Sequence, residues 1–155
     1  MRPCQHKTTL LMKVTILFLL IPVIAFNQSI PKGANTIKIA AVTFKEAAEA
    51  LLDAGYSFEK ADSSFKTIKT EWKQGVGKTK WMKLRFFIHQ KDSTLILTGN
   101  WYNTMFEGQD VLGKHFTADN SFEKIEYTIG NPKNCFLLMQ DFALSFNKPI
   151  EYCKQ

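Results

Sequence analysis

The spacing of apolar residues changes along this chain, and each change marks an expected element. Five apolar residues recur at the spacing of one helix face: Phe44, Ala47, Ala48, Leu51 and Leu52. Thr43 precedes this face and Glu46 follows three residues later, which is the pattern of a capping box. Gly55 supplies the left-handed residue that ends many helices. The pattern predicts a helix over residues 44–54.

The middle of the chain alternates between apolar and polar residues, which is typical of strands. In the clearest run, 81–90, one face would carry Met82, Leu84, Phe86 and Ile88. The opposite face would carry Trp81, Lys83, Arg85, Phe87 and His89. Shorter runs predict strands over residues 36–41, 56–61, 65–72, 94–102 and 121–129. The short connections between the runs favour hairpins and an antiparallel sheet.

A second helix is expected over residues 132–147, with Asn131 as its cap and Pro132 at its first position. Its apolar stripe would be Cys135, Leu138, Met139, Phe142 and Phe146. The sequence therefore predicts one α+β domain over residues 28–155, in the order β-α-β-β-β-β-(β)-α. Its antiparallel sheet of about five or six strands would be covered by the C-terminal helix, because an apolar sheet face needs a cover.

This order of elements, over residues 34–147, resembles the helix-grip arrangement of the BamC lipoprotein domains. It is also similar to that of short secreted proteins of unknown function from Gram-negative bacteria. The resemblance rests on the order of the elements and not on a motif, so it implies a fold and assigns no functional residue.

Residues 14–26, VTILFLLIPVIAF, form an uncharged apolar run that follows Lys7 and Lys13. This order is typical of a signal peptide: a basic segment, then an apolar segment, then a small residue, Ala25, near the cleavage site. It predicts a signal peptide over residues 1–27. The run is shorter than the ~20 residues that a transmembrane helix needs, so we expect membrane contact only during export. Met12 offers an alternative start to Met1. The expected location is the periplasm or the exterior.

Removal of the signal peptide would also change the net charge of the chain. The chain has a net charge of +6, and removal of Arg2, Lys7 and Lys13 lowers it to +3. This mild excess does not indicate nucleic-acid binding. Cys4 precedes the apolar run and no cysteine lies between residues 5 and 134, which argues against a lipid anchor of the lipobox type.

Catalytic chemistry has little support in the sequence. No HExxH, GxSxG, CxxC, Walker-type or GxGxxG motif occurs, and no spacing indicates a metal site or a cofactor. Asp110, His115 and Asp119 are close in sequence and would serve a small hydrolase if they converged in a cleft. Ordinary surface residues are the favoured interpretation, and we expect no enzyme.

Two groups of residues are candidate binding sites. The mixed face of run 81–90, formed by Trp81, Lys83, Arg85, Phe87 and His89, combines aromatic and cationic side chains. The alternative is a solvated sheet face on which Lys and Arg stems cover the rings. The segment 101–106 would line a pocket mouth with Trp101, Tyr102 and Phe106, or pack on the core.

Cys135 and Cys153 leave two alternatives open. A disulfide is feasible if the tail runs straight back, since the helix and the tail would each span about 20 Å. Such a bridge would raise the free energy of unfolding by roughly 3 kcal/mol, because it constrains the unfolded chain. The other interpretation is a free, buried Cys135.

The sequence favours a non-catalytic secreted or periplasmic binding or assembly module of the cell envelope. Its partner would be an envelope component, a protein, a glycan or a lipid. The alternative is a carrier that holds a small apolar ligand between the sheet and the C-terminal helix. An apolar cavity under that helix favours the carrier, and a closed core with an exposed aromatic patch favours the module.

Overall fold

The computed structural model describes residues 29–155 except 112 and 118–120. The predicted signal peptide therefore lies outside the described residues. The described part is α+β, as predicted, with two α-helices, two short 3-10 helices and a mainly antiparallel sheet. In chain order the elements are β1 (Thr36–Ala40), α2 (Phe44–Asp53), β2 (Phe58–Asp62), β3 (Thr67–Thr70), β4 (Lys73–Gln74), η1 (Gly77–Thr79), β5 (Met82–Lys91), β6 (Thr94–Asn103), η2 (Thr104–Phe106), β7 (Asp110–Val111), β8 (Lys114–His115), β9 (Glu123–Lys124), α3 (Asn131–Leu144) and β10 (Ile150–Cys153).

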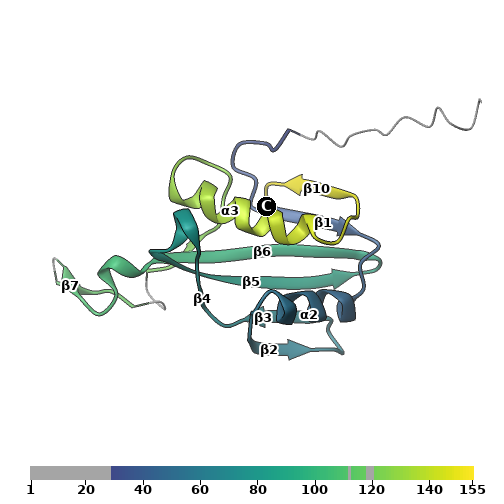
Figure 1. Cartoon of the computed structure of the whole chain (residues 1–155), viewed down its shortest axis with the longest axis horizontal. Coiled ribbons are helices and arrows are strands. Elements are labelled where there is room, and N and C mark those ends of the chain that lie inside the picture. The colour runs from purple at the N-terminus through teal and green to yellow at the C-terminus, as the bar shows by residue number, and fades with distance from the viewer. Residues whose placement is uncertain (1–28, 112, 118–120) are drawn as a thin grey trace, which may run out of the picture.

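The main sheet is antiparallel, in the order β10-β1-β6-β5-β3-β2, with β4 beside β5 and β9 beside β6. Its centre is the long β5–β6 hairpin, which pairs without interruption from Met82–Asn103 to Lys91–Thr94. Both helices lie on one face of this sheet (Figure 1). We call the opposite face the open face of the sheet.

Local signals set the bounds of α2. Thr43 and Glu46 form the predicted capping box, in which each side chain accepts a hydrogen bond from the other's backbone N–H. At the other end, the N–H of Gly55 donates to Leu52 and the N–H of Tyr56 donates to Leu51. These two bonds and the positive φ of Gly55 make a Schellman motif.

The start of α3 differs from the prediction. Asn131 is already helical, and the N-cap is Gly130, which has a φ of 75° and makes no side-chain cap. Because Gly130 turns the chain through a backbone conformation that glycine adopts freely, the helix begins before Asn131 can act as its cap. Pro132 lies in the first turn, as predicted. The helix ends at Leu144, three residues earlier than predicted.

The core lies between the helices and the sheet. The predicted alternation along β5 is confirmed, since Met82, Leu84, Phe86 and Ile88 are at most 2% exposed. Phe86 lies at the centre, with ring centroids 5.0 Å from Tyr56 and 6.0 Å from Phe142. Gly99 lies directly across from Phe86 on β6, and the lack of a side chain there leaves room for the Phe86 ring.

One strand prediction was wrong, and one strand was not predicted. The run 121–129 forms only the two-residue strand β9, because the chain bends after Ile125 and leaves Ile129 82% exposed. The chain ends in a strand that was not predicted, β10, which pairs antiparallel with β1. Its apolar residues Ile150 and Tyr152 pack against the core.

Cys135 and Cys153 are not joined in the structure, which favours the alternative of a free, buried Cys135 over the disulfide. Cys135 is buried on the helix side of the sheet, where its Sγ lies 3.3 Å from Sδ of Met82. Cys153 lies next to Tyr152 on β10 and faces the other way, with its Sγ 3.2 Å from Oε1 of Glu151. The sheet separates the two sulfur atoms, because β10 pairs with β1 instead of returning along α3.

Candidate functional site

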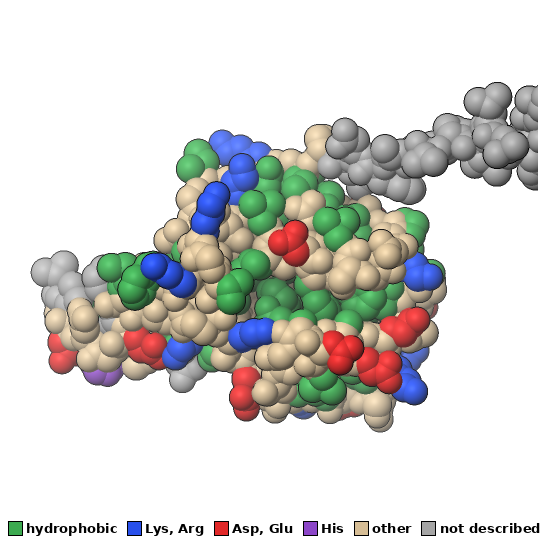
Figure 2. All heavy atoms as spheres, viewed as in Figure 1, with side chains coloured by type: hydrophobic (Ala, Val, Ile, Leu, Met, Phe, Trp, Pro, Cys, Tyr) green, Lys and Arg blue, Asp and Glu red, His purple; other side chains and the backbone are tan. Residues whose placement is uncertain are grey.

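An apolar groove of about 500 Å³ lies between α2 and α3 on the helix side of the sheet. We call it the helix groove. Figure 2 shows hydrophobic side chains gathered in a hollow between the two helices. The groove is lined by Ala50, Asp53, Ala54, Tyr56, Lys73, Gln74, Gly75, Val76, Leu84, Leu138, Phe142 and Ser145. Its volume is in the range of small-molecule binding sites.

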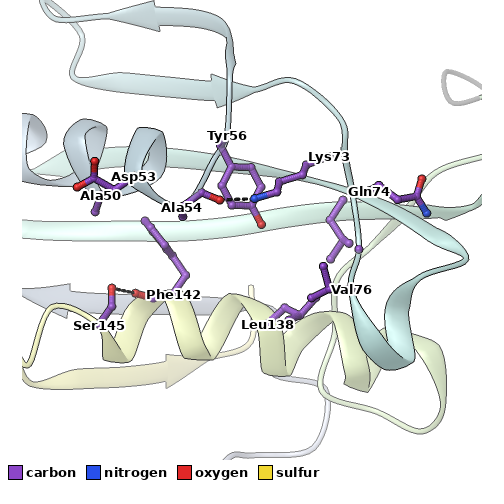
Figure 3. Close-up of a pocket in the computed structure, with 12 residues that line it drawn as sticks. Ala50, Asp53, Ala54, Tyr56, Lys73, Gln74, Val76, Leu138, Phe142 and Ser145 are labelled. Atoms are coloured by element: carbon purple, nitrogen blue, oxygen red, sulfur yellow. Dashed lines mark hydrogen bonds between the residues drawn. The ribbon is translucent and has the colours of Figure 1, made fainter.

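Small side chains on α2 leave the space that the groove occupies. Ala50 of α2 and Ala54, the C-cap of that helix, face it from one side, while Leu138 and Phe142 face it from α3 (Figure 3). Leu84 of β5 forms part of the floor. The helical spacing of 50 and 54, and of 138 and 142, places each pair on one face of its helix. Because two alanines oppose a leucine and a phenylalanine, the helices do not close over the sheet.

Lys73 and Gln74 lie at the β4 edge of the groove, while Asp53 and Ser145 line it at the C-terminal ends of α2 and α3. The amine of Lys73 donates a hydrogen bond to the carbonyl of Ala54, at the C-terminus of α2 where a cation is favourable. The same amine lies 4.4 Å from the ring centroid of Tyr56. Burial raises the pKa of Tyr56 to about 12, so its hydroxyl stays neutral at physiological pH.

The lining therefore suits a molecule with an apolar body. Most of its contact surface is alanine, leucine, valine, phenylalanine and the tyrosine ring, and the polar groups are few and at the margin. Ser145 is already occupied, since its hydroxyl donates to the carbonyl of Phe142 at 2.7 Å. The lining provides hydrophobic burial with the neutral Tyr56 hydroxyl, the Lys73 cation and the Asp53 carboxylate, and it holds no nucleophile bound to a base.

The predicted mixed face of β5 is the open face of the sheet. Lys83, Arg85, Phe87 and His89 alternate with the buried core residues of β5 and lie opposite the helices. Trp81 precedes the strand and is 54% exposed, with the Lys80 amine 5.0 Å from its ring. The structure brings four of these five residues onto one surface and leaves Trp81 at its end.

Arg85 is held in an aromatic cluster that the sequence pattern did not reveal. The residue is 8% exposed, and its guanidinium carbon lies 4.4 Å from the ring of Trp72 and 5.4 Å from the rings of Phe87 and Phe122. Its Nη1 lies 3.4 Å from a carboxylate oxygen of Glu59. Arg85 therefore holds Trp72 and Phe122 on the sheet and is not available to a ligand.

Lys83 belongs to a second closed network. Its amine lies 3.1 Å from both carboxylate oxygens of Glu107, and the hydroxyl of Tyr102 donates to Glu107 at 2.9 Å. These hydrogen bonds, that of Tyr102 first, lower the pKa of Glu107 and keep it ionised. The charge of Lys83 is therefore neutralised by its neighbours.

The structure does not assemble the predicted pocket mouth at residues 101–106. Trp101 and Tyr102 are both in β6 and face opposite sides of the sheet. Trp101 is 8% exposed and belongs to the core, while Tyr102 joins Lys83 on the open face. The side chain of Phe106 lies outside the described residues.

The candidate hydrolase residues are on the surface. Asp110 and His115 face each other across the β7–β8 hairpin, with Oδ1 and Nδ1 2.9 Å apart and side chains 77% and 58% exposed. Asp119 lies outside the described residues. Within the described ranges, no group of three or more His, Cys, Asp or Glu side chains could hold a metal ion.

Similarity to known proteins does not assign a function to these sites. No protein-family model and no curated protein matches this sequence. Among the described residues, no helix has the length and hydropathy needed to span a membrane.

Proposed function

We propose that this protein is a non-catalytic binding protein that works in the periplasm or outside the cell, and that the helix groove holds a small, mainly apolar ligand. The observation that carries the proposal is the groove itself, an apolar hollow between α2 and α3, whereas the carrier hypothesis expected a cavity between the C-terminal helix and the sheet. The location rests on the signal-peptide pattern of residues 14–26.

The lining supports an apolar ligand over a polar one. Apolar surface lies on three sides of the groove, at Tyr56, Leu84, Leu138 and Phe142. Burial of such surface stabilises a complex by about 25 cal/mol per Å². The Tyr56 hydroxyl and the Lys73 amine at one edge can orient a ligand that carries one polar group. The aromatic cluster around Arg85 then has a structural role.

The proposal can be tested with the neutral apolar dye 1-N-phenylnaphthylamine, whose fluorescence rises on transfer to an apolar site. The 155-residue chain would be expressed in a Gram-negative host and purified in the form in which it accumulates. We expect saturable binding of one dye per protein. Ala50→Phe should weaken binding by at least about tenfold, because the ring fills space that the dye needs.

Ala48→Phe is the matched control. Ala48 is on the same helix and is partly buried, but it does not line the groove, so its variant should bind the dye as the parent does. Equal losses in both variants, with both folded by circular dichroism, would contradict the proposal. Absence of saturable binding in the parent protein would also contradict it.

A further inference from the structure

The open face of the sheet carries two adjoining hollows, of about 400 and 280 Å³. They share Phe87, Thr98 and Gln155, so they form one continuous surface on both sides of the Phe87 ring. We call this surface the open-face hollow. It lies on the side of the sheet away from the helix groove and is independent of the apolar-ligand function proposed for that groove.

Its charged side chains are basic. Four basic residues line it, Lys60, Lys69 and His89 on one side of Phe87 and Lys124 on the other, and no Asp or Glu side chain does. The amine of Lys69 is bound by Glu59 just outside the lining. Over residues 29–155 apart from 112 and 118–120, the side-chain amines of Lys60 and Lys124 make no hydrogen bond or ion pair. Two uncommitted cations therefore flank an aromatic ring.

The floor between these cations combines apolar and hydrogen-bonding groups. Phe87 and Ile96 are partly exposed and supply a flat apolar platform. Thr67 and Thr98 present hydroxyls, and Asn100 presents a side-chain amide. Arg85 supports the platform from one side, since its guanidinium carbon lies 5.4 Å from the Phe87 ring. This contact holds the Phe87 ring from the Arg85 side.

We propose that the open-face hollow binds an anionic polysaccharide. A sugar ring would pack its C–H face on Phe87, its hydroxyls would bond to Thr67, Thr98 and Asn100, and its acidic groups would meet Lys60 and Lys124. Repeated acidic groups along a glycan chain match cations on both sides of a central ring. Single-stranded nucleic acid fits less well, because it is bound by a series of stacking rings, and this lining offers only the Phe87 ring and the His89 imidazole.

The test uses the same purified 155-residue chain and polygalacturonate oligomers as the probe. Neutral dextran and a 20-nucleotide oligothymidylate serve as comparison ligands, with affinity measured by isothermal titration calorimetry. We expect saturable binding of polygalacturonate that weakens with added salt, and none of dextran. Replacing both flanking cations, in Lys60→Gln/Lys124→Gln, should weaken binding by about tenfold.

The matched control is Lys32→Gln/Lys45→Gln, which removes the same net charge from exposed positions outside the hollow. Its affinity should change by less than about twofold. Phe87→Leu should weaken binding with all charges in place. An equal loss in both double variants, tighter binding of oligothymidylate than of polygalacturonate, or no binding of polygalacturonate would overturn the proposal.

Discussion

Phe86→Ala is expected to lower the free energy of unfolding by about 3–5 kcal/mol. Phe86 is fully buried in the central strand β5 and touches the rings of Tyr56 and Phe142. Gly99 lies across from it on β6 and has no side chain to fill the cavity, and the Ile125 side chain packs over this glycine. Urea denaturation of the parent and the variant measures the difference.

Phe65→Ala is the control for this experiment. Phe65 is 74% exposed in the turn between β2 and β3, so its truncation should change the free energy of unfolding by less than about 0.5 kcal/mol. A loss below about 1 kcal/mol for Phe86→Ala would show that residue 86 is not at the centre of the core.

Stability is expected to fall steeply above pH 9, and Cys135 is the main cause at the start of that fall. Burial raises the pKa of the Cys135 thiol from 9.0 to about 12. Between these values the unfolded chain loses the proton and the folded chain keeps it, so the free energy of unfolding decreases as the pH rises. The slope is about 1.4 kcal/mol per pH unit, and the full loss is about 4 kcal/mol.

Urea midpoints of the parent protein, Cys135→Ala and Cys153→Ala, measured from pH 8 to 11, test this expectation. In Cys135→Ala the urea midpoint should depend only weakly on pH up to about pH 10. Above that pH Tyr56 begins to contribute, because burial raises its pKa to about 12. Cys153→Ala should keep most of the steep fall, since Cys153 is only partly buried on β10, although burial and Glu151 raise its pKa as well. The same pH dependence in Cys135→Ala and the parent would refute the assignment.

The sequence predicted those helices and strands whose capping residues or apolar spacing lie within the element itself. The capping box of α2 and the alternation of β5 and β6 depend on neighbours a few residues away, and the structure confirms them. β10 was missed because its four residues are a weak signal alone, and its pairing partner β1 is more than a hundred residues earlier.

The sites were harder to predict for the same reason. The sequence placed Arg85 and Phe87 on one face, but it gave no sign that Trp72 and Phe122 would enclose the guanidinium. It identified α2 as rich in alanine, but the space beside Ala50 depends on where α3 lies, and the residues of the two helices are far apart in the chain. The spacing of apolar residues within one helix or strand does not predict a surface that several elements form together.

The most direct test of the central claim, that the groove between α2 and α3 is a ligand site, is an NMR titration with 1-N-phenylnaphthylamine. We expect saturable amide shift changes that are largest at Ala50, Ala54, Gly75 and Leu138, which line the groove. Largest changes at Phe87 and Thr98 on the opposite side of the sheet, or no saturable change at any amide, would contradict this claim.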